Sequence, residues 1–187
     1  KCAKKFNDVW NYFFLSKEVP YGDKGKKRAG AFNYITKNTL LRPRDYIKYL
    51  QICAEKSIKL GKNKISPDVI KKANKDFSNH LKMEMIDEIH SIIPDIDKIL
   101  DIFSQLRKQT FSIPEFKNAF DEYLENNPMN KYDFQYILKT LFEFSVIGNV
   151  PRQKSFQVFK YRNKEANLNL NENITIHRGL FRALQIV

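Results

Sequence analysis

The sequence predicts a mainly α-helical protein with a small β-sheet. Apolar residues recur at three- and four-residue spacing through most of the chain, and prolines stand where helical patterns begin. The clearest β-prone runs are short and lie in the second half. With 187 residues, including 15 Phe and 9 Tyr, the chain can build a proper core in one domain or in two small ones.

The first half of the chain is expected to be all-helical. Its apolar spacing predicts helices over 6–15, 31–38, 45–57, 66–79 and 81–93. Ser66 is the expected N-cap of the fourth of these helices, with Pro67 at its first helical position. Residues 20–30 are rich in glycine and charge and are expected to form a flexible loop. Pro94 marks the expected domain boundary.

The second half alternates helices with short strands. We expect helices over 95–108, 114–126 and 130–144, and strands over 110–113, 145–150, 155–162 and 174–178. Helix, strand, helix, helix, strand, strand is the order of a winged helix, with the asparagine-rich stretch 163–173 as a loop or wing.

The helix over 45–57 has the most informative start. Pro43 suits a first helical turn, and Asp45 complements the helix dipole there. Arg42 and Arg44 flank the proline, so two forked guanidiniums stand at a helix N-terminus, where proteins bind phosphate. A second interpretation is that both arginines are surface charges paired with Asp or Glu.

The same helix is expected to carry an apolar face and a glycine stop. The apolar residues at helical spacing are Ile47, Leu50, Cys53 or Ala54, and Ile58. Gly61 follows Lys59 and is the expected C′ residue.

Two motifs carry a family resemblance. Residues 39–47, Thr-Leu-Leu-Arg-Pro-Arg-Asp-Tyr-Ile, precede a Cys-Ala helix and resemble the lid region of bacterial P-loop ATPases of the AAA+ and STAND type. In particular they resemble a group of predicted anti-phage defence ATPases with a helical lid and then a winged helix. The ending 176–184, Ile-His-Arg-Gly-Leu-Phe-Arg-Ala-Leu, is similar to the end of those proteins. The resemblance implies a helical lid-like domain over 1–93 and a winged-helix domain over 94–187.

The resemblance also implies a role for the arginines. Arg44 would sense the γ-phosphate of ATP, Pro43 would touch the base, and Arg42 would be the alternative sensor. ATP with Mg²⁺ would be bound mainly by an N-terminal P-loop core of the same protein. The chain would then be a cytoplasmic accessory region, coupling nucleotide state to assembly of an oligomer or to an effector in antiviral defence.

The net charge of +12 supports an alternative, a winged-helix nucleic-acid-binding protein. Residues 1–93 hold 20 Lys or Arg against 10 Asp or Glu, whereas residues 94–187 hold 13 against 11. The basic residues expected to touch a phosphate backbone are Lys24, Lys26, Lys27, Arg28, Lys154, Lys160, Arg162 and Lys164. AT-rich codons and a solvated loop would also explain these lysines. In helix 130–144 acids nearly cancel bases, so sequence-specific DNA reading by it is not expected.

Several kinds of chemistry are missing from the sequence. No segment matches the phosphate-binding motif G-x-x-x-x-G-K-[ST], so the chain alone is not expected to be an enzyme, although the full-length protein would be an ATPase. No apolar run approaches the length of a membrane span. The two cysteines and three histidines form no metal-ligand pattern. A third interpretation is an interaction domain whose Phe- and Tyr-rich surfaces meet a partner protein.

Overall fold

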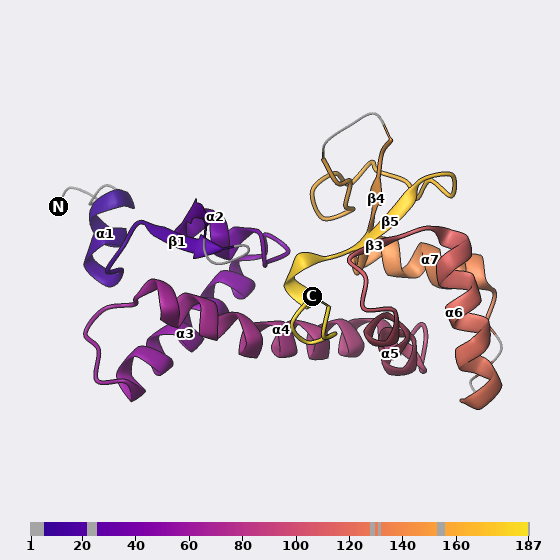
Figure 1. Ribbon diagram of the computed structural model, residues 1–187, viewed down its shortest axis with the longest axis horizontal. Helices are drawn as coiled ribbons and strands as arrows, with labels where there is room; N and C mark the ends of the chain where they lie inside the picture. The colour runs from indigo at the N-terminus through magenta and orange to yellow at the C-terminus, as the bar shows by residue number, and fades with distance from the viewer. Residues whose placement is uncertain (1–5, 22–25, 128–129, 131, 153–155, 187) are drawn as a thin grey trace. The chain divides into compact units, whose positions relative to one another are not determined.

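The computed structural model describes residues 6–21, 26–127, 130, 132–152 and 156–186. The chain divides into two compact units, residues 1–77 (unit 1) and residues 78–187 (unit 2). Helices dominate the described residues, with a two-stranded and a three-stranded antiparallel sheet (Figure 1). The predicted class, mainly α with a small β-sheet, is confirmed. The units divide upstream of Pro94, and the domains 1–93 and 94–187 stay a prediction.

Unit 1 combines one hairpin with helices. In chain order its elements are α1 (Phe6–Phe13), β1 (Glu18–Tyr21), β2 (Lys27–Gly30), α2 (Ala31–Thr36), α3 (Pro43–Lys59) and the beginning of α4 (Pro67–His90). Tyr49 of α3 lies in the core of this unit and has no exposed surface. Its ring centroid lies 4.8 Å from that of Phe77, and its hydroxyl donates to the carbonyl oxygen of Ile70 at 3.1 Å. Packing and one satisfied hydroxyl therefore hold α3 against α4.

The flexible loop predicted over residues 20–30 is wrong at both of its described ends. Strands β1 and β2 pair there as an antiparallel hairpin, with Val19 opposite Ala29 and Pro20 opposite Arg28. Val19 is fully buried, which gives the hairpin an inner face. The charged residues Lys27 and Arg28 belong to the exposed strand β2, and a charged composition does not reveal a pairing partner.

Helix α3 begins and ends as predicted. Pro43 occupies its first turn, and Gly61 beyond its end has φ 64°, the left-handed conformation that favours glycine. The apolar face predicted for α3 is present but is not the buried face. The buried residues of α3 are Asp45, Tyr49, Ile52, Cys53 and Ser57, whereas Ile47 is 68% exposed and Ile58 is 75% exposed.

Helix α4 begins at Pro67, as predicted, but the break predicted near residue 80 is wrong. A single helix of 24 residues runs to His90. No glycine or proline interrupts it, and buried residues recur every fourth position through the predicted break, at Phe77, Leu81, Met85 and Ile89. One uninterrupted buried stripe favours one helix.

Unit 2 has the element order of a winged helix. After the end of α4 come α5 (Ile96–Leu106), β3 (Thr110–Phe111), α6 (Ile113–Asn126), α7 (Phe134–Glu143), β4 (Ile147–Val150), β5 (Asn173–Ile176) and a 3₁₀ turn (Arg178–Leu180). The sheet order is β3-β5-β4, with both pairs antiparallel, so β5 is the central strand (Figure 1). Thr175 of β5 lies opposite Thr110 on one side and Gly148 on the other.

The strand predicted over 155–162 is wrong where the structure describes it. Only Val158 pairs, through an isolated bridge in which it exchanges two 2.9 Å backbone hydrogen bonds with Asn149. The chain then turns, because the amide of Tyr161 donates to Ser145 Oγ at 2.9 Å. Strand β5 pairs with β4 over four residues and overlaps the predicted last strand, 174–178, beginning one residue before it.

Two helix starts in unit 2 differ from each other in how well the sequence predicted them. Ser112 caps α6 by accepting from the amide of Glu115 at 3.3 Å, next to the predicted Pro114. Helix α7 starts later than predicted: Asp133 is its N-cap, whereas Asn130 donates from Nδ2 to Asp95 at 2.7 Å. Asn130 therefore ties a loop to the start of α5 instead of capping a helix.

Candidate functional site

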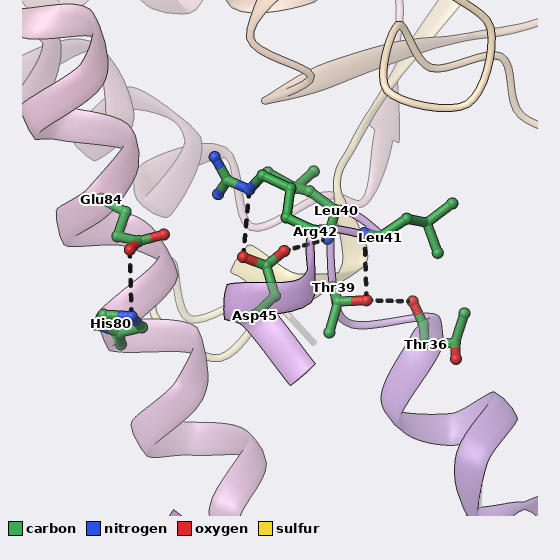
Figure 2. Close-up of polar contacts among 8 residues, drawn as sticks. All are labelled: Thr36, Thr39, Leu40, Leu41, Arg42, Asp45, His80 and Glu84. Carbon is green, nitrogen blue, oxygen red and sulfur yellow. Dashed lines mark hydrogen bonds and ion pairs between the residues drawn. The ribbon is translucent and has the colours of Figure 1, made fainter. Parts of the chain in front are cut away.

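The start of α3 is held by a network of backbone and side-chain bonds (Figure 2). Thr39 Oγ1 donates to the carbonyl oxygen of Thr36 at 3.0 Å and accepts from the amide of Leu41 at 3.4 Å. Leu41 has φ 61°, a conformation that costs a non-glycine residue free energy. Arg42 is the N-cap residue, and its side chain makes no capping hydrogen bond. Thr39 therefore ties the turn before α3 to the last residue of α2.

Asp45 is the centre of this network. Its residue is 2% exposed, and its Oδ2 accepts from the amide of Leu40 at 2.8 Å. Its Oδ1 accepts from Nε of Arg42 at 3.2 Å, which makes a buried ion pair (Figure 2). A buried carboxylate needs such partners, since an uncompensated charge inside a protein is costly. Asp45 thus orders the loop before α3 as well as complementing the helix dipole.

The three residues predicted to contact ATP differ in their surroundings. The Arg42 side chain is ion-paired with Asp45 and is 27% exposed. Pro43 and Arg44 are both exposed, at the first two positions of the helix. The second interpretation, a carboxylate-paired arginine, therefore describes Arg42. Sequence reasoning missed the anchoring role of Asp45, although an acid at the third helical position is the signal for it.

The described part of the basic stretch 24–28 lies in the hairpin. Lys26, Lys27 and Arg28 are exposed, and the Arg28 guanidinium lies 3.3 Å from a carboxylate oxygen of Glu18 across the hairpin. Both partners are more than half exposed, so this pair stabilises little. Lys24 lies outside the described residues.

The predicted basic residues of unit 2 are partly engaged in local contacts. Lys160 lies 3.3 Å from Glu143 of α7 and donates to the carbonyl oxygen of Ala166 at 3.0 Å. Arg162 donates from Nε to the hydroxyl of Tyr161 at 2.8 Å, and Lys164 is exposed. Lys154 lies outside the described residues. These contacts give Lys160 and Arg162 structural roles in the wing region.

The net charge follows the division into units. Residues 1–77 contain 19 Lys or Arg against 7 Asp or Glu, a net charge of +12. Residues 78–187 contain 14 of each, a net charge of zero. The electrostatic attraction for polyanions therefore belongs to unit 1, and unit 2 contributes none on balance.

Other reactive groups are structural where the structure describes them. Across the described ranges, no group of three or more His, Cys, Asp or Glu side chains is arranged to hold a metal ion. His80 and Glu84 lie one turn apart on α4, with Nε2 and Oε1 separated by 3.5 Å (Figure 2). Burial raises the pKa of the Cys53 thiol to about 12, so Cys53 is a packed, unreactive side chain.

The described residues form a mainly α-helical protein with two small antiparallel sheets. Residues 4–85 match the model of a family described as the FunZ-associated C-terminal helical domain. The matched segment contains the hairpin, α3 and most of α4, and it fits a C-terminal region of a larger protein. No curated protein and no solved structure matches the chain. Among the described helices, none combines the length and apolar character that a membrane span requires.

Proposed function

We propose that this chain is the C-terminal accessory region of a P-loop ATPase and that Arg44 senses bound nucleotide. The observation that carries the proposal is the exposure of Pro43 and Arg44 at the start of α3. Arg42 is committed to Asp45, whereas Arg44 and Pro43 are exposed at a helix N-terminus whose N-cap side chain makes no capping bond. A triphosphate suits such a place, because the positive end of the helix dipole and a guanidinium both attract phosphate oxygens.

The residues of this chain fit ATP without building a complete site for it. Arg44 would contact the γ-phosphate, Pro43 would lie against the base, and Arg42 would hold the turn in place through Asp45. The N-terminal P-loop core would supply Mg²⁺ and most nucleotide contacts, and bound ATP would supply the phosphoanhydride bond that is hydrolysed. The similarity to a C-terminal helical domain family supports the accessory position. Nucleotide state would be coupled to oligomer assembly or to an effector in anti-phage defence, as the resemblance of residues 39–47 implies.

The test is nucleotide hydrolysis by the complete protein carrying Arg44→Ala. We expect hydrolysis or nucleotide-driven assembly to fall by one to two orders of magnitude, roughly the loss of a charge-assisted contact to a transferring phosphoryl group. Lys72→Ala, at an exposed position of α4, is the control and should leave both unchanged. Unchanged hydrolysis and assembly in both Arg44→Ala and Arg42→Ala would refute the proposal.

A second candidate, nucleic-acid binding by unit 1, rests on the confinement of the whole +12 charge to residues 1–77. Lys26, Lys27 and Arg28 would contact the phosphate backbone without reading sequence. It predicts salt-dependent gel shifts by this chain alone, weakened when these three residues are replaced by Ser and unchanged when Lys160 and Arg162 are replaced. No shift at physiological salt would dismiss it.

A further inference from the structure

Unit 1 contains an open apolar groove between α1, α2 and α3. Its volume is about 620 Å³, and its lining is almost entirely apolar. The residues that shape it are Trp10, Phe14, Phe32, Ile35, Ile47 and Leu50. The groove is independent of the arginines at the start of α3, because none of the three predicted ATP contacts lines it.

A row of aromatic rings forms one wall of the groove. Trp10 stacks on Phe14 with ring centroids 3.8 Å apart and planes 5° apart, and it meets Phe32 edge-on at 5.7 Å. Phe32 in turn stacks with Tyr46 at 5.8 Å. The floor is anchored by backbone, since the amide of Ile65 donates to the carbonyl oxygen of Phe13 at 2.8 Å. The wall is preorganised, so binding would cost little side-chain ordering.

The opposite wall is the apolar face of α3 that the core leaves uncovered. Ile47, Leu50 and Ala54 line the groove at three- and four-residue spacing. Ile58 continues the same face beyond the groove, and Ile47 and Ile58 are 68% and 75% exposed. At ~1.5 Å per residue, the stripe extends about 16 Å along α3. A straight stripe of this length matches the apolar anchors of a second helix better than it matches a small ligand. Exposed apolar area of this kind marks a binding surface.

The charge around the groove selects the kind of helix. Lys17, Lys48 and Lys64 neighbour the groove in sequence or on the same helix, and all three retain exposed surface. Glu55 of α3 is an acid beside the groove and accepts from the lining residue Gln51 at 2.9 Å. The carbonyl oxygen of Lys17 accepts from the amide of Ala31 beside Phe32, and Lys64 reaches the carbonyl oxygen of Asn11 on α1 at 3.1 Å. The unit as a whole carries +12, so an occupant with an acidic polar face would be attracted.

We propose that the α1–α3 groove binds an amphipathic helix of a partner protein whose polar face is acidic. The helix would lay apolar side chains at i, i+3 or i+4, and i+7 against the aromatic wall and the α3 stripe. Its carboxylates would be attracted by the net positive charge of unit 1. A second copy of this chain is disfavoured as occupant, because two units of +12 repel each other. A membrane surface is disfavoured because the apolar residues line a concavity.

Trp10 makes the groove directly observable, because it is the only tryptophan of the chain. The probe is a synthetic amphipathic peptide of about four helical turns, with leucines on one face and glutamates on the other. Titrated into the full chain, it should shift the Trp10 emission saturably and gain helicity by circular dichroism. Two control peptides, one with lysines replacing the glutamates and one with the same residues scrambled, should bind at least tenfold more weakly.

Exposed substitutions locate the binding site without disturbing the core. Ile47→Glu should weaken the peptide at least about tenfold, and Lys48→Glu should weaken it several-fold and reduce its salt dependence. Met83→Glu on α4 and Lys139→Glu on α7 are the matched controls, since both residues are exposed and lie outside the groove. Both controls should bind within about twofold of the parent chain, because each leaves the groove intact.

Four results would overturn the proposal. The first is a Trp10 emission that no acidic peptide changes, and the second is equal affinity for the glutamate and lysine peptides. The third is a shift produced only by phosphatidylcholine–phosphatidylserine vesicles, which would assign the groove to a lipid surface. The fourth is concentration-dependent dimerisation that Ile47→Glu abolishes, which would make the groove an interface between copies.

Discussion

Arg42 and Asp45 form an ion pair across the first turn of α3, with Nε of the arginine 3.2 Å from Oδ1 of a carboxylate that is almost fully buried. The pair joins the residue before the helix to the third residue within it, and the same carboxylate accepts from Leu40. Arg42 therefore helps to order the turn before α3, whereas Arg44 is exposed at the start of the helix.

The ion pair predicts that Asp45→Ala destabilises unit 1 by about 2–4 kcal/mol, because it removes two hydrogen bonds and leaves Arg42 without its carboxylate. Urea unfolding followed by Trp10 fluorescence measures the change. Asp68→Ala, an exposed acid in the first turn of α4, should cost less than about 1 kcal/mol. Equal losses for the two variants would show that the buried network is not what stabilises the start of α3.

Gly148 of β4 lies so close to the backbone of Val158 and the ring of Phe159 that a larger residue should destabilise unit 2. A Cβ at this position would lie 2.7 Å from both Cδ1 of Phe159 and the carbonyl oxygen of Val158. We expect Gly148→Ala to cost about 1–3 kcal/mol of unit 2 stability, as overpacking does. Gly30→Ala is the control, since its nearest neighbour would be 3.8 Å away. Thermal unfolding by circular dichroism should separate the two, and a stable Gly148→Ala would contradict the packing.

Two buried serines should respond in opposite directions to replacement by alanine. The Ser57 hydroxyl has no hydrogen-bond partner among the described residues, so Ser57→Ala should raise the free energy of unfolding by about 0.5–1 kcal/mol. Ser66 precedes the first residue of α4, so Ser66→Ala should lower it by about 1 kcal/mol. The urea midpoints of the two variants, measured side by side, test whether the changes have opposite signs. A destabilised Ser57→Ala would show that the Ser57 hydroxyl has a hydrogen-bond partner.

Asp95 predicts an acid-sensitive contact in unit 2. A hydrogen bond from Lys98 lowers the pKa of Asp95 from 3.8 to about 2. Burial opposes this shift in part, and hydrogen bonds from Asn130 add to it. Because the folded pKa is depressed, its contribution is complete above about pH 4 and is lost as the pH falls toward 2. Asp95→Asn should flatten the pH dependence of unfolding in that window, whereas Asp87→Asn on an exposed face of α4 should not. Identical acid profiles for all three proteins would contradict this.

The buried thiol of Cys53 predicts that the stability of unit 1 depends on pH at alkaline values. Its pKa rises from 9.0 to about 12 because burial disfavours the thiolate, despite the attraction of Lys56. The contribution to stability is therefore complete below about pH 9 and declines as the pH rises toward 12. In a Cys2→Ser background, Cys53 should resist alkylation at pH 8 until urea unfolds unit 1. Rapid labelling of the folded chain would refute the burial.

The sequence predicted the features that depend on neighbouring residues. Pro43 and Pro67 start helices, Gly61 adopts the left-handed conformation after α3, and the order of elements in unit 2 is that of a winged helix. Each of these depends on local backbone geometry or on a short apolar period, which a sequence displays directly.

Features that depend on distant partners were predicted poorly. Val19 belongs to a hairpin because it has a buried place to occupy. Val158 meets β4 only through an isolated bridge to Asn149, whereas β5 pairs with β4 over four residues. At the candidate site, the sequence placed Arg42, Pro43 and Arg44 at one helix start, whereas the pairing of Arg42 with Asp45 required the coordinates. Which face of α3 is covered also depends on tertiary packing, since Ile47 and Tyr49 are both apolar and only one is buried.

The confinement of all net charge to residues 1–77 has a consequence for encounters in solution. At low ionic strength an anionic macromolecule is drawn to one half of this molecule and is indifferent to the other, before any contact forms. The first collision is therefore oriented by the long-range field. Salt should slow association with every acidic partner, whatever the chemistry of the contacts that follow.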